Sequence, residues 1–350
     1  VVFVNNKEKT MKSLKKMGAF ALSLMLCVSM LVSCGGDDKK SEEATKEASL
    51  SGNVKIVAAK GVPSDIVSKL PGDYKVSKVD DTVDVKEAVV DGEFDFAVLT
   101  PIEAAKLYNQ KDNFRAVTTV SLGQWKLDAT GYGGEEDPTL AYLSGKRIYA
   151  LDEEDEMDEE EKSEQEESKA VAEGEEAEEA SDAEEIEMEE PLEMSEEVLR
   201  ALMNANGRTL YSNNLDWQEK DALKDIATAS PVRILADNAT LDAIEKDNKD
   251  LKELFDLNSL WQENFKSDIP GYILIVNKDF ISKRGDEIQV VLDDMADSLE
   301  EAQKTTKAKL VCYNNSNRGI SLIKKFNKVM QEHNNNAIGG EVPSDYYYTK

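Results

Sequence analysis

The chain has 350 residues, which indicates about two domains rather than one. Hydrophobic residues make up 40% of it and aromatic residues 7%, enough to build a core, so a wholly disordered chain is excluded. The formal net charge of -29 argues against a nucleic-acid partner and against attraction to anionic lipid, because both carry negative charge themselves.

The N-terminal segment has the pattern of an export signal. Residues 1–10 precede Met11 and are predicted to be an upstream extension that is foreign to the natural protein. Lys12, Lys15 and Lys16 follow, and the apolar stretch 17–31 comes directly after them. A basic start before a short apolar run is typical of a secretory signal peptide, and the run is too short for an ordinary membrane span.

The apolar stretch ends in Leu31-Val32-Ser33-Cys34, which resembles a bacterial lipobox. Such a motif is cleaved just before the cysteine, whose thiol then carries the lipid. Residues 11–33 are therefore predicted to be a lipoprotein signal peptide, and Cys34 the lipidated residue. The alternatives are a plain signal peptide with an incidental cysteine, or an N-terminal membrane helix. Lipid on Cys34 implies that the folded part lies outside the cell, anchored to the outer face of the cell membrane.

Residues 34–52 are predicted to be a solvated tether, because they are mostly Gly, Asp, Lys, Ser and Glu without apolar periodicity. Of the three cysteines, Cys27 leaves with the signal peptide and Cys34 is acylated. Cys312 is then alone, so no disulfide framework is expected. Its position beside Leu310 and Val311 favours a small buried residue.

Strand-like and helix-like segments alternate between residues 53 and 124. The first strand is expected at 54–59 and is followed by a turn at 61–64; further strands are expected at 94–99 and 116–120. A helix with Val85 and Val89 on one face precedes Gly92. This alternation predicts a mainly parallel sheet with right-handed crossovers.

The helix after the second of these strands has an explicit start signal. Thr100 can cap it, Pro101 suits its first position and Glu103 completes a capping box. We expect this helix to run to about Tyr108.

The same alternation returns after Gly145. Strands are expected at 146–151, 232–236 and 272–276, with one helix capped at Ser195 and another that starts at Asn238 or Thr240. Two amphipathic helices follow the last strand, one with apolar residues at helical spacing over 288–302 and a shorter one over 320–330.

A block of acidic residues interrupts this second unit. Between Asp152 and Glu197 there are 26 acidic residues and two basic ones, which accounts for most of the formal charge. Such a segment cannot bury enough apolar surface to fold alone, so residues 152–194 are predicted to be a disordered acidic insertion. It contains no loop of EF-hand spacing, so we expect no specific metal site in it.

The order of these elements resembles the substrate-binding proteins of nitrate, sulfonate and thiamine-precursor type ABC importers. Short stretches distributed over most of residues 53–350 carry the resemblance; they lie at 54–63, 85–98, 104–109, 143–149, 269–272 and 337–348. The resemblance implies an α/β, two-lobed type II periplasmic-binding fold with mainly parallel sheets and a hinge of two crossing strands, near 124–130 and 272–276. Lobe 1 would comprise residues 53–124 and 273–350, and lobe 2 residues 125–272.

Two parts of the chain depart from the family's pattern. A glycine-rich Thr-Pro loop usually precedes the helix that corresponds to 195–204, and the acidic insertion replaces that loop here. The stretch 208–230 also matches poorly. Anion binding is therefore not carried over from the family, and the charge of the insertion favours a neutral or cationic ligand.

Ligand contacts are expected where loops follow parallel strands and helices begin, because unpaired N–H groups collect there. The residues at these positions are Val62, Pro63, Ser64, Thr100, Pro101, Ile102, Gln124, Trp125, Asn238 and Thr240. Thr100 and Thr240 also have the simpler role of helix caps, and Trp125 can equally be a buried hinge residue. The tyrosines at 346–348 are expected to pack the C-terminal tail against the first lobe.

The resemblance implies a solute-binding component of an ABC importer, which captures a small molecule and delivers it to a membrane permease. It implies a monomer with no cofactor and no bound metal. A surface lipoprotein without a transport role is the first alternative. An enzyme of thiamine-precursor or menaquinone synthesis is the second, but only His333 and Cys312 offer the usual proton-transfer or nucleophilic groups, so no catalytic residues and no enzyme activity are expected.

Overall fold

The computed structural model describes residues 49–133, 138–152, 193–311, 313 and 316–349. The predicted extension 1–10, signal peptide 11–33, lipidated Cys34 and residue Cys312 lie outside the described residues. So do most of the tether 34–52 and most of the acidic insertion 152–194.

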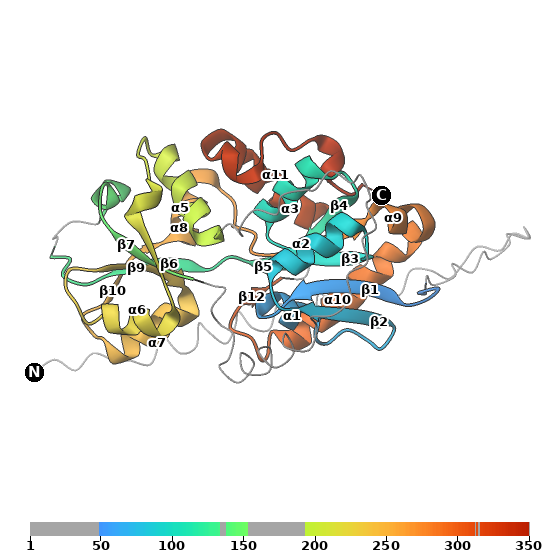
Figure 1. The fold of residues 1–350 in the computed structure, drawn as a ribbon, viewed down its shortest axis with the longest axis horizontal. Coiled ribbons are helices and arrows are strands. Elements are labelled where there is room, and N and C mark those ends of the chain that lie inside the picture. The colour runs from blue at the N-terminus through green and yellow to red at the C-terminus, as the bar shows by residue number, and fades with distance from the viewer. Residues whose placement is uncertain (1–48, 134–137, 153–192, 312, 314–315, 350) are drawn as a thin grey trace, which may run out of the picture. The chain divides into compact units, whose positions relative to one another are not determined.

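Among the described residues, the first five-stranded sheet has the order β2-β1-β3-β11-β4 (Figure 1). β11 runs antiparallel to both of its neighbours, whereas the other strands are parallel to one another. Its strands are β1 (Val54–Ala59), β2 (Tyr74–Val79), β3 (Phe96–Leu99), β4 (Phe114–Thr119) and β11 (Ile273–Asn277). One face is covered by α1 (Val62–Val67), α9 (Lys278–Arg284) and α10 (Ile288–Ala302), the other by α2 (Thr82–Asp91), α3 (Pro101–Gln110) and part of α11 (Ser316–His333).

The second five-stranded sheet has the order β10-β6-β9-β7-β8. β6 is antiparallel to its two neighbours, and β7 is parallel to both β8 and β9. Its strands are β6 (Trp125–Ala129), β7 (Ile148–Leu151), β8 (Leu215–Gln218), β9 (Arg233–Asp237) and β10 (Lys252–Asp256). α5 (Met194–Ala205) and α8 (Leu257–Phe265) pack on one face, and α6 (Lys220–Ile226) and α7 (Asn238–Asp247) on the other.

Two paired segments connect the sheets. The chain enters the second sheet through 120–124 and returns through 269–272, where the N–H of Gly123 donates to the carbonyl of Ile269 and that of Gly271 to Ser121. β12 (Lys309–Leu310) pairs with β5 (Ser121–Leu122) at the same place. The two crossing segments therefore form a short hinge, which lies a few residues before the predicted crossings at 124–130 and 272–276. The predicted α/β fold with two sheets is confirmed.

The buried strands of each sheet agree with the sequence prediction, whereas three of the four edge strands were missed. The strands expected at 54–59, 94–99, 116–120, 146–151, 232–236 and 272–276 all form, with small changes in their ends. Strands β2, β8 and β10 were not predicted. Each is an edge strand with only part of its residues buried, so its sequence lacks the apolar run that marks a central strand.

At the two ends of the folded part, the N-terminal boundary differs from the prediction and the C-terminal tail agrees with it. Folded structure begins slightly before residue 53, because Ser51 donates from its backbone N–H and its hydroxyl to the carboxylate of Glu287, at 3.1 and 2.6 Å. Arg284 holds the carbonyl of Gly52 at 2.8 Å. At the other end Tyr346 and Tyr347 pack into the core of the first sheet, as predicted for the C-terminal tail.

Candidate functional site

The topology brings all ten predicted ligand residues to two facing sheet edges, each of which is formed by the ends of strands and not by an edge strand. β1, β3 and β4 are parallel, so the residues after each of them lie at one edge of the first sheet. β6 is antiparallel to β9, so the start of β6 lies beside the end of β9 at one edge of the second sheet. The segment 120–124 joins these two edges directly.

The first loop enters a helix rather than a simple turn. α1 begins at Val62, after Gly61, whose φ of 79° falls in the left-handed region that favours glycine. Ser64 donates from its hydroxyl to the carbonyl of Gly61 at 3.0 Å. Pro63 and Ser64 are buried and Val62 is half-buried, so Val62 is the most accessible residue of this group.

The helix start at Thr100 has the predicted capping box. The N–H of Glu103 donates to Thr100 Oγ1 at 3.2 Å, and the Thr100 N–H and hydroxyl both donate to Glu103 Oε2. Glu103 is buried and lies 4.0 Å from the ammonium group of Lys86. This box occupies two of the first donors of α3 with protein groups, which leaves less of the helix start for an anionic ligand.

Gln124, Trp125 and Asn238 lie together where β6 begins and β9 ends. The Asn238 N–H donates to the carbonyl of Gln124 at 3.0 Å, and Trp125 pairs with Asp237 in the sheet register. The Trp125 ring packs against Gly123, and only glycine leaves room for it there, because a Cβ at this position would lie 2.0 Å from the ring.

The predicted cap of α7 is corrected by the structure. α7 begins at Asn238, one of the two predicted starts, but Asp237 rather than Thr240 caps it. The Asp237 carboxylate accepts from the N–H groups of Ala239 and Thr240 at 2.8 and 3.0 Å. An aspartate directly before a helix is a strong capping signal, but this cap was not predicted. Thr240 is buried within the first turn instead.

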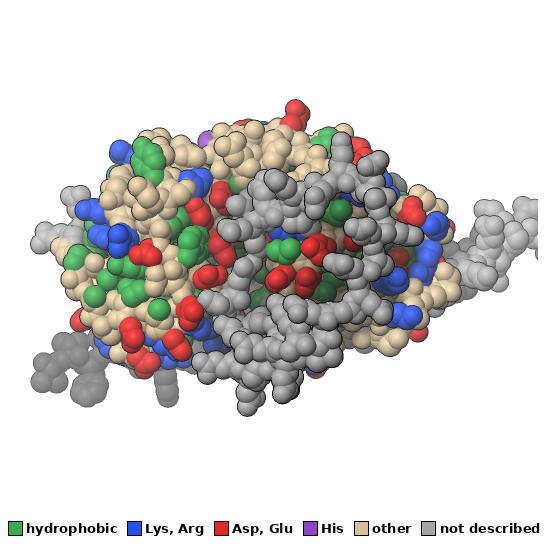
Figure 2. Space-filling view, viewed as in Figure 1, with side chains coloured by type: hydrophobic (Ala, Val, Ile, Leu, Met, Phe, Trp, Pro, Cys, Tyr) green, Lys and Arg blue, Asp and Glu red, His purple; other side chains and the backbone are tan. Residues whose placement is uncertain are grey.

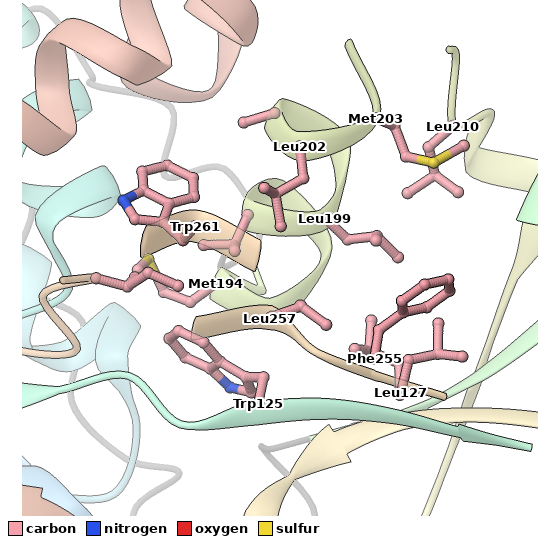
Figure 3. Close-up of a cluster of buried hydrophobic side chains, with 14 of the residues drawn as sticks. Trp125, Leu127, Met194, Leu199, Leu202, Met203, Leu210, Phe255, Leu257 and Trp261 are labelled. Carbon is pink, nitrogen blue, oxygen red and sulfur yellow. The ribbon is translucent and has the colours of Figure 1, made fainter. Parts of the chain in front are cut away.

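An apolar cluster joins the two facing edges, and we call it the interlobe cluster (Figure 3). It includes side chains from both lobes, among them Ile102, Ala105, Trp125, Leu127, Met194, Trp261, Phe326 and Met330. In Figure 3 the Met194 side chain lies between the indoles of Trp125 and Trp261. Ile102 and Trp125 are thus brought together, but in a shared core, so both would contact ligand only after the lobes separate.

The start of α5, just after the acidic insertion, was predicted wrongly. The helix begins at Met194 without a side-chain cap, and Ser195 is buried inside its first turn rather than capping it. Glu197 is also buried, and Asn334 donates from Nδ2 to both its carboxylate and its carbonyl. Burial raises the pKa of Glu197, while Asn334 and Arg200 oppose that rise.

Helix α11 was assigned to the first lobe from its position in the sequence, yet it contacts both lobes. Near its start the carbonyl of Gly319 accepts from the Thr119 hydroxyl at 3.2 Å. Near its end Phe326 stacks on Trp261 with ring centroids 5.5 Å apart. The carbonyl of His333 accepts from Asn204 of α5 at 2.6 Å. An amphipathic pattern shows which face of a helix is buried, but it does not show that two lobes share that face.

The surface of the described part is mixed in charge. Figure 2 shows hydrophobic side chains reaching the surface mainly over the second sheet, and Asp and Glu side chains gathering nearer the middle of the same face. Within the described residues no group of three or more His, Cys, Asp or Glu side chains has the spacing of a metal site. In the same residues no helix combines the length and the apolar character needed to cross a membrane.

Comparison with known proteins gives likeness of structure without likeness of sequence. The chain matches no protein-family model and no curated protein sequence. It is similar to the crystal structure of an ABC transporter protein from Parabacteroides distasonis, with a TM-score of 0.51 and 13% identity over 85% of this chain and 99% of that one. It is also similar to the periplasmic aliphatic sulphonate binding protein of Escherichia coli, with a TM-score of 0.48 and 12% identity over 79% of this chain and 78% of that one. At these identities the likeness is one of fold: this chain has the two-sheet α/β fold of the Parabacteroides distasonis ABC transporter structure.

Proposed function

We propose that the protein is the solute-binding component of an ABC importer, which captures a small molecule between its lobes and delivers it to a membrane permease. The observation that carries this proposal is the pair of facing sheet edges joined by the hinge at 120–124 and 269–272. Helix starts and strand ends collect at those edges, and they present N–H and side-chain groups to a small ligand. The solved structure of similar fold, described as an ABC transporter protein, supports the same class.

We propose a neutral or cationic ligand. The first turn of α3 holds the buried carboxyl group of Glu103, and the first turn of α5 holds that of Glu197. Carboxylates at helix starts occupy the positive end of each helix dipole, where an anionic ligand would otherwise bind. The four predicted contacts that stay partly accessible are Val62, Thr100, Gln124 and Asn238, and we propose that these bind first.

The cellular setting is part of the same proposal. Lipid on Cys34 would anchor the protein to the outer face of the cell membrane, within reach of a permease, and the protein would act as a monomer without a cofactor or bound metal. Replacing Cys34 by alanine should abolish incorporation of labelled fatty acid and release the protein from membranes. Incorporation that persists in Cys34→Ala would contradict this assignment.

Two other functions fit the fold. A surface lipoprotein with no transport role would keep the anchor but bind no solute, and it is favoured by the interlobe cluster, which holds the lobes together in this structure. An enzyme would need reacting groups at the facing edges, and the ten residues proposed there include neither His nor Cys.

A thermal-shift screen of the full chain in mild detergent tests the proposal directly. The panel contains nitrate, sulfonates, thiamine precursors, amino acids and polyamines. A specific ligand at a hundredfold excess over its dissociation constant stabilises the folded state by about 2.7 kcal/mol, which is readily visible. We expect a hit among the neutral or cationic members.

Matched variants distinguish binding at the proposed site from binding elsewhere. The shift should disappear in Gln124→Ala and Asn238→Ala, and should remain in Ser282→Ala, whose exposed hydroxyl donates to a carbonyl in α9. A shift produced only by anions would contradict the proposed ligand charge. A flat panel would favour the lipoprotein without a transport role.

A further inference from the structure

Strand β6 carries a buried carboxyl group on the face that α7 covers. Successive side chains of a strand point to opposite faces, so Lys126 and Asp128 share one face, and Leu127 and Ala129 the other. Leu127 and Ala129 belong to the interlobe cluster. Asp128 is fully buried on the opposite face, beneath helix α7.

The groups around Asp128 are mostly acidic. Its partner in strand β10 is Glu253, and α7 contributes Asp242 and Glu245. The cation on this face is Lys126, whose ammonium group lies 2.7 Å from Asp242 and 3.7 Å from Glu253.

The other neighbouring strand and the rest of α7 supply no further charge at this point. In β9 the residue opposite Asp128 is Ile234, while Arg233 pairs with Ala129 and so lies on the other face. Lys246 and Asp247 of α7 are exposed. Among the described residues of β6, β9, β10 and α7, Lys126 is therefore the cation on the face of Asp128, and it already contacts two other carboxylates.

Neither carboxyl oxygen of Asp128 receives a hydrogen bond from an N–H or O–H donor in the described part of the chain. Its neighbours Glu245 and Glu253 are also carboxyl groups, and they would repel an ionised Asp128. Burial, followed by the nearby Glu245 carboxyl group, raises the pKa of Asp128 to about 8, with Lys126 opposing the rise.

We propose that Asp128 carries a proton in the folded protein, because it is fully buried and no donor among the described residues reaches its carboxyl oxygens, and that this proton makes the second lobe proton-sensitive. Loss of that proton would leave a buried negative charge without a hydrogen-bond donor from this part of the chain, near Glu245 and Glu253. The repulsion would act on α7, whose start is bonded to the hinge through the Asn238 N–H and the Gln124 carbonyl. The effect on folding stands without the proposed function, whereas an effect on ligand affinity through Asn238 rests on it.

The sign of the pH effect follows from the raised pKa. An aspartate in the unfolded chain loses its proton near pH 3.9, about four pH units below Asp128 in the folded state. The folded state is therefore favoured most strongly in acid. This contribution falls as the pH rises from about 4 to about 8, and it is constant above that.

Unfolding of the full chain by urea at several pH values between 5 and 9 tests the proposal, with Asp128→Asn as the variant. The amide has the shape of the protonated carboxyl group, can donate to Glu245, and does not titrate. The folding equilibrium constant of Asp128→Asn, divided by that of the unaltered protein, should rise about tenfold per pH unit between pH 5 and 8, then level off. Asp293→Asn, at an exposed carboxylate of α10, is the control and should give a ratio that does not change with pH.

A ratio for Asp128→Asn that stays constant from pH 5 to 9 would overturn the proposal. If that variant does not fold, Glu245→Gln gives the same decision. Its amide N–H can donate to an ionised Asp128, so its pH dependence should move to lower pH. If Glu245→Gln keeps the pH dependence of the unaltered protein, the proposed proton on Asp128 is contradicted. Because unfolding is measured without ligand, neither result depends on whether the protein binds a solute.

Discussion

The two sheets have the same strand order, yet they differ in the chemistry of one equivalent strand. Numbered from the opposite edge, the second sheet reads β8-β7-β9-β6-β10, which matches β2-β1-β3-β11-β4 position by position. In each, the fourth strand is the one that arrives through the hinge and runs antiparallel to its neighbours. β11 reads ILIVN with every residue buried, whereas β6 reads WKLDA and carries Lys126 and buried Asp128.

This comparison separates what the topology requires from what it tolerates. β11 is covered by apolar clusters on both faces, so each of its side chains needs an apolar partner. β6 has one apolar face, and on the other a polar contact with α7 is enough to bury the strand. The strand order is therefore compatible with either arrangement, and the ionisable groups of β6 add pH sensitivity without changing the fold.

Placing an amide in β11 should have the largest effect. Leu274 is fully buried in the first sheet, and Leu274→Asn removes its apolar contacts while adding a polar group without a planned partner. Loss of a buried leucine costs about 2–5 kcal/mol, and an unsatisfied amide adds about 1–3 kcal/mol. Urea unfolding at pH 7 should show a loss of this size, or no folded protein. A loss below about 1 kcal/mol would mean that β11 tolerates polarity as β6 does.

Cutting the apolar link between the lobes should have the next largest effect. Phe326→Ala removes the ring that stacks on Trp261 and leaves a cavity in the interlobe cluster, at a cost of about 3–5 kcal/mol. Lys325→Ala, at the exposed position before it, should change the unfolding free energy by less than about 0.5 kcal/mol. Equal effects of the two changes would show that α11 does not hold the lobes together.

Two buried carboxyl groups, one in each lobe, should respond to pH in opposite directions. The guanidinium group of Arg284 and the donors of Ser51 lower the pKa of Glu287 to about 2, whereas Asp128 lacks such donors. Glu287→Gln should therefore cost about 2 kcal/mol at pH 7, and this loss should fade as the pH falls from about 4.5 towards 2. Urea unfolding at pH 7, 4 and 3 checks the sign, with exposed Glu300→Gln as the control. A cost for Glu287→Gln that persists undiminished at pH 3 would contradict the assigned pair.

The sequence predicted the centre of the fold well, because buried strands such as β1 and β11 are continuous apolar runs between turn residues. It predicted the cap at Thr100 because all three members of the capping box are adjacent in the chain. Contacts between segments far apart in the chain have no comparable local sequence pattern. The bond between Asn334 and Glu197 joins residues 137 positions apart, and no local pattern marks either as buried.

Asp128 was missed for a related reason. In the sequence it alternates with Leu127 and Ala129, which is the pattern of a strand with one solvated face. The carboxyl group is buried because α7 covers that face of the sheet. The sequence of a strand does not show which helix will cover it. Site residues that depend on local order were therefore predictable, and those that depend on packing between elements were not.

The smallest expected effect sharpens the comparison between the helix starts at the two edges. Thr100 and Asp237 both cap the helix that follows a strand, while Thr240 is a buried residue of the first turn. Asp237→Ala should cost about 1 kcal/mol, because it removes the acceptor of the Ala239 and Thr240 N–H groups. Thr240→Val keeps the shape of the side chain and should cost less than Asp237→Ala in the same urea titration. If Thr240→Val cost more than Asp237→Ala, Thr240 would be the capping residue of α7. The side chain of Asp237 at the hinge would then be free for another partner.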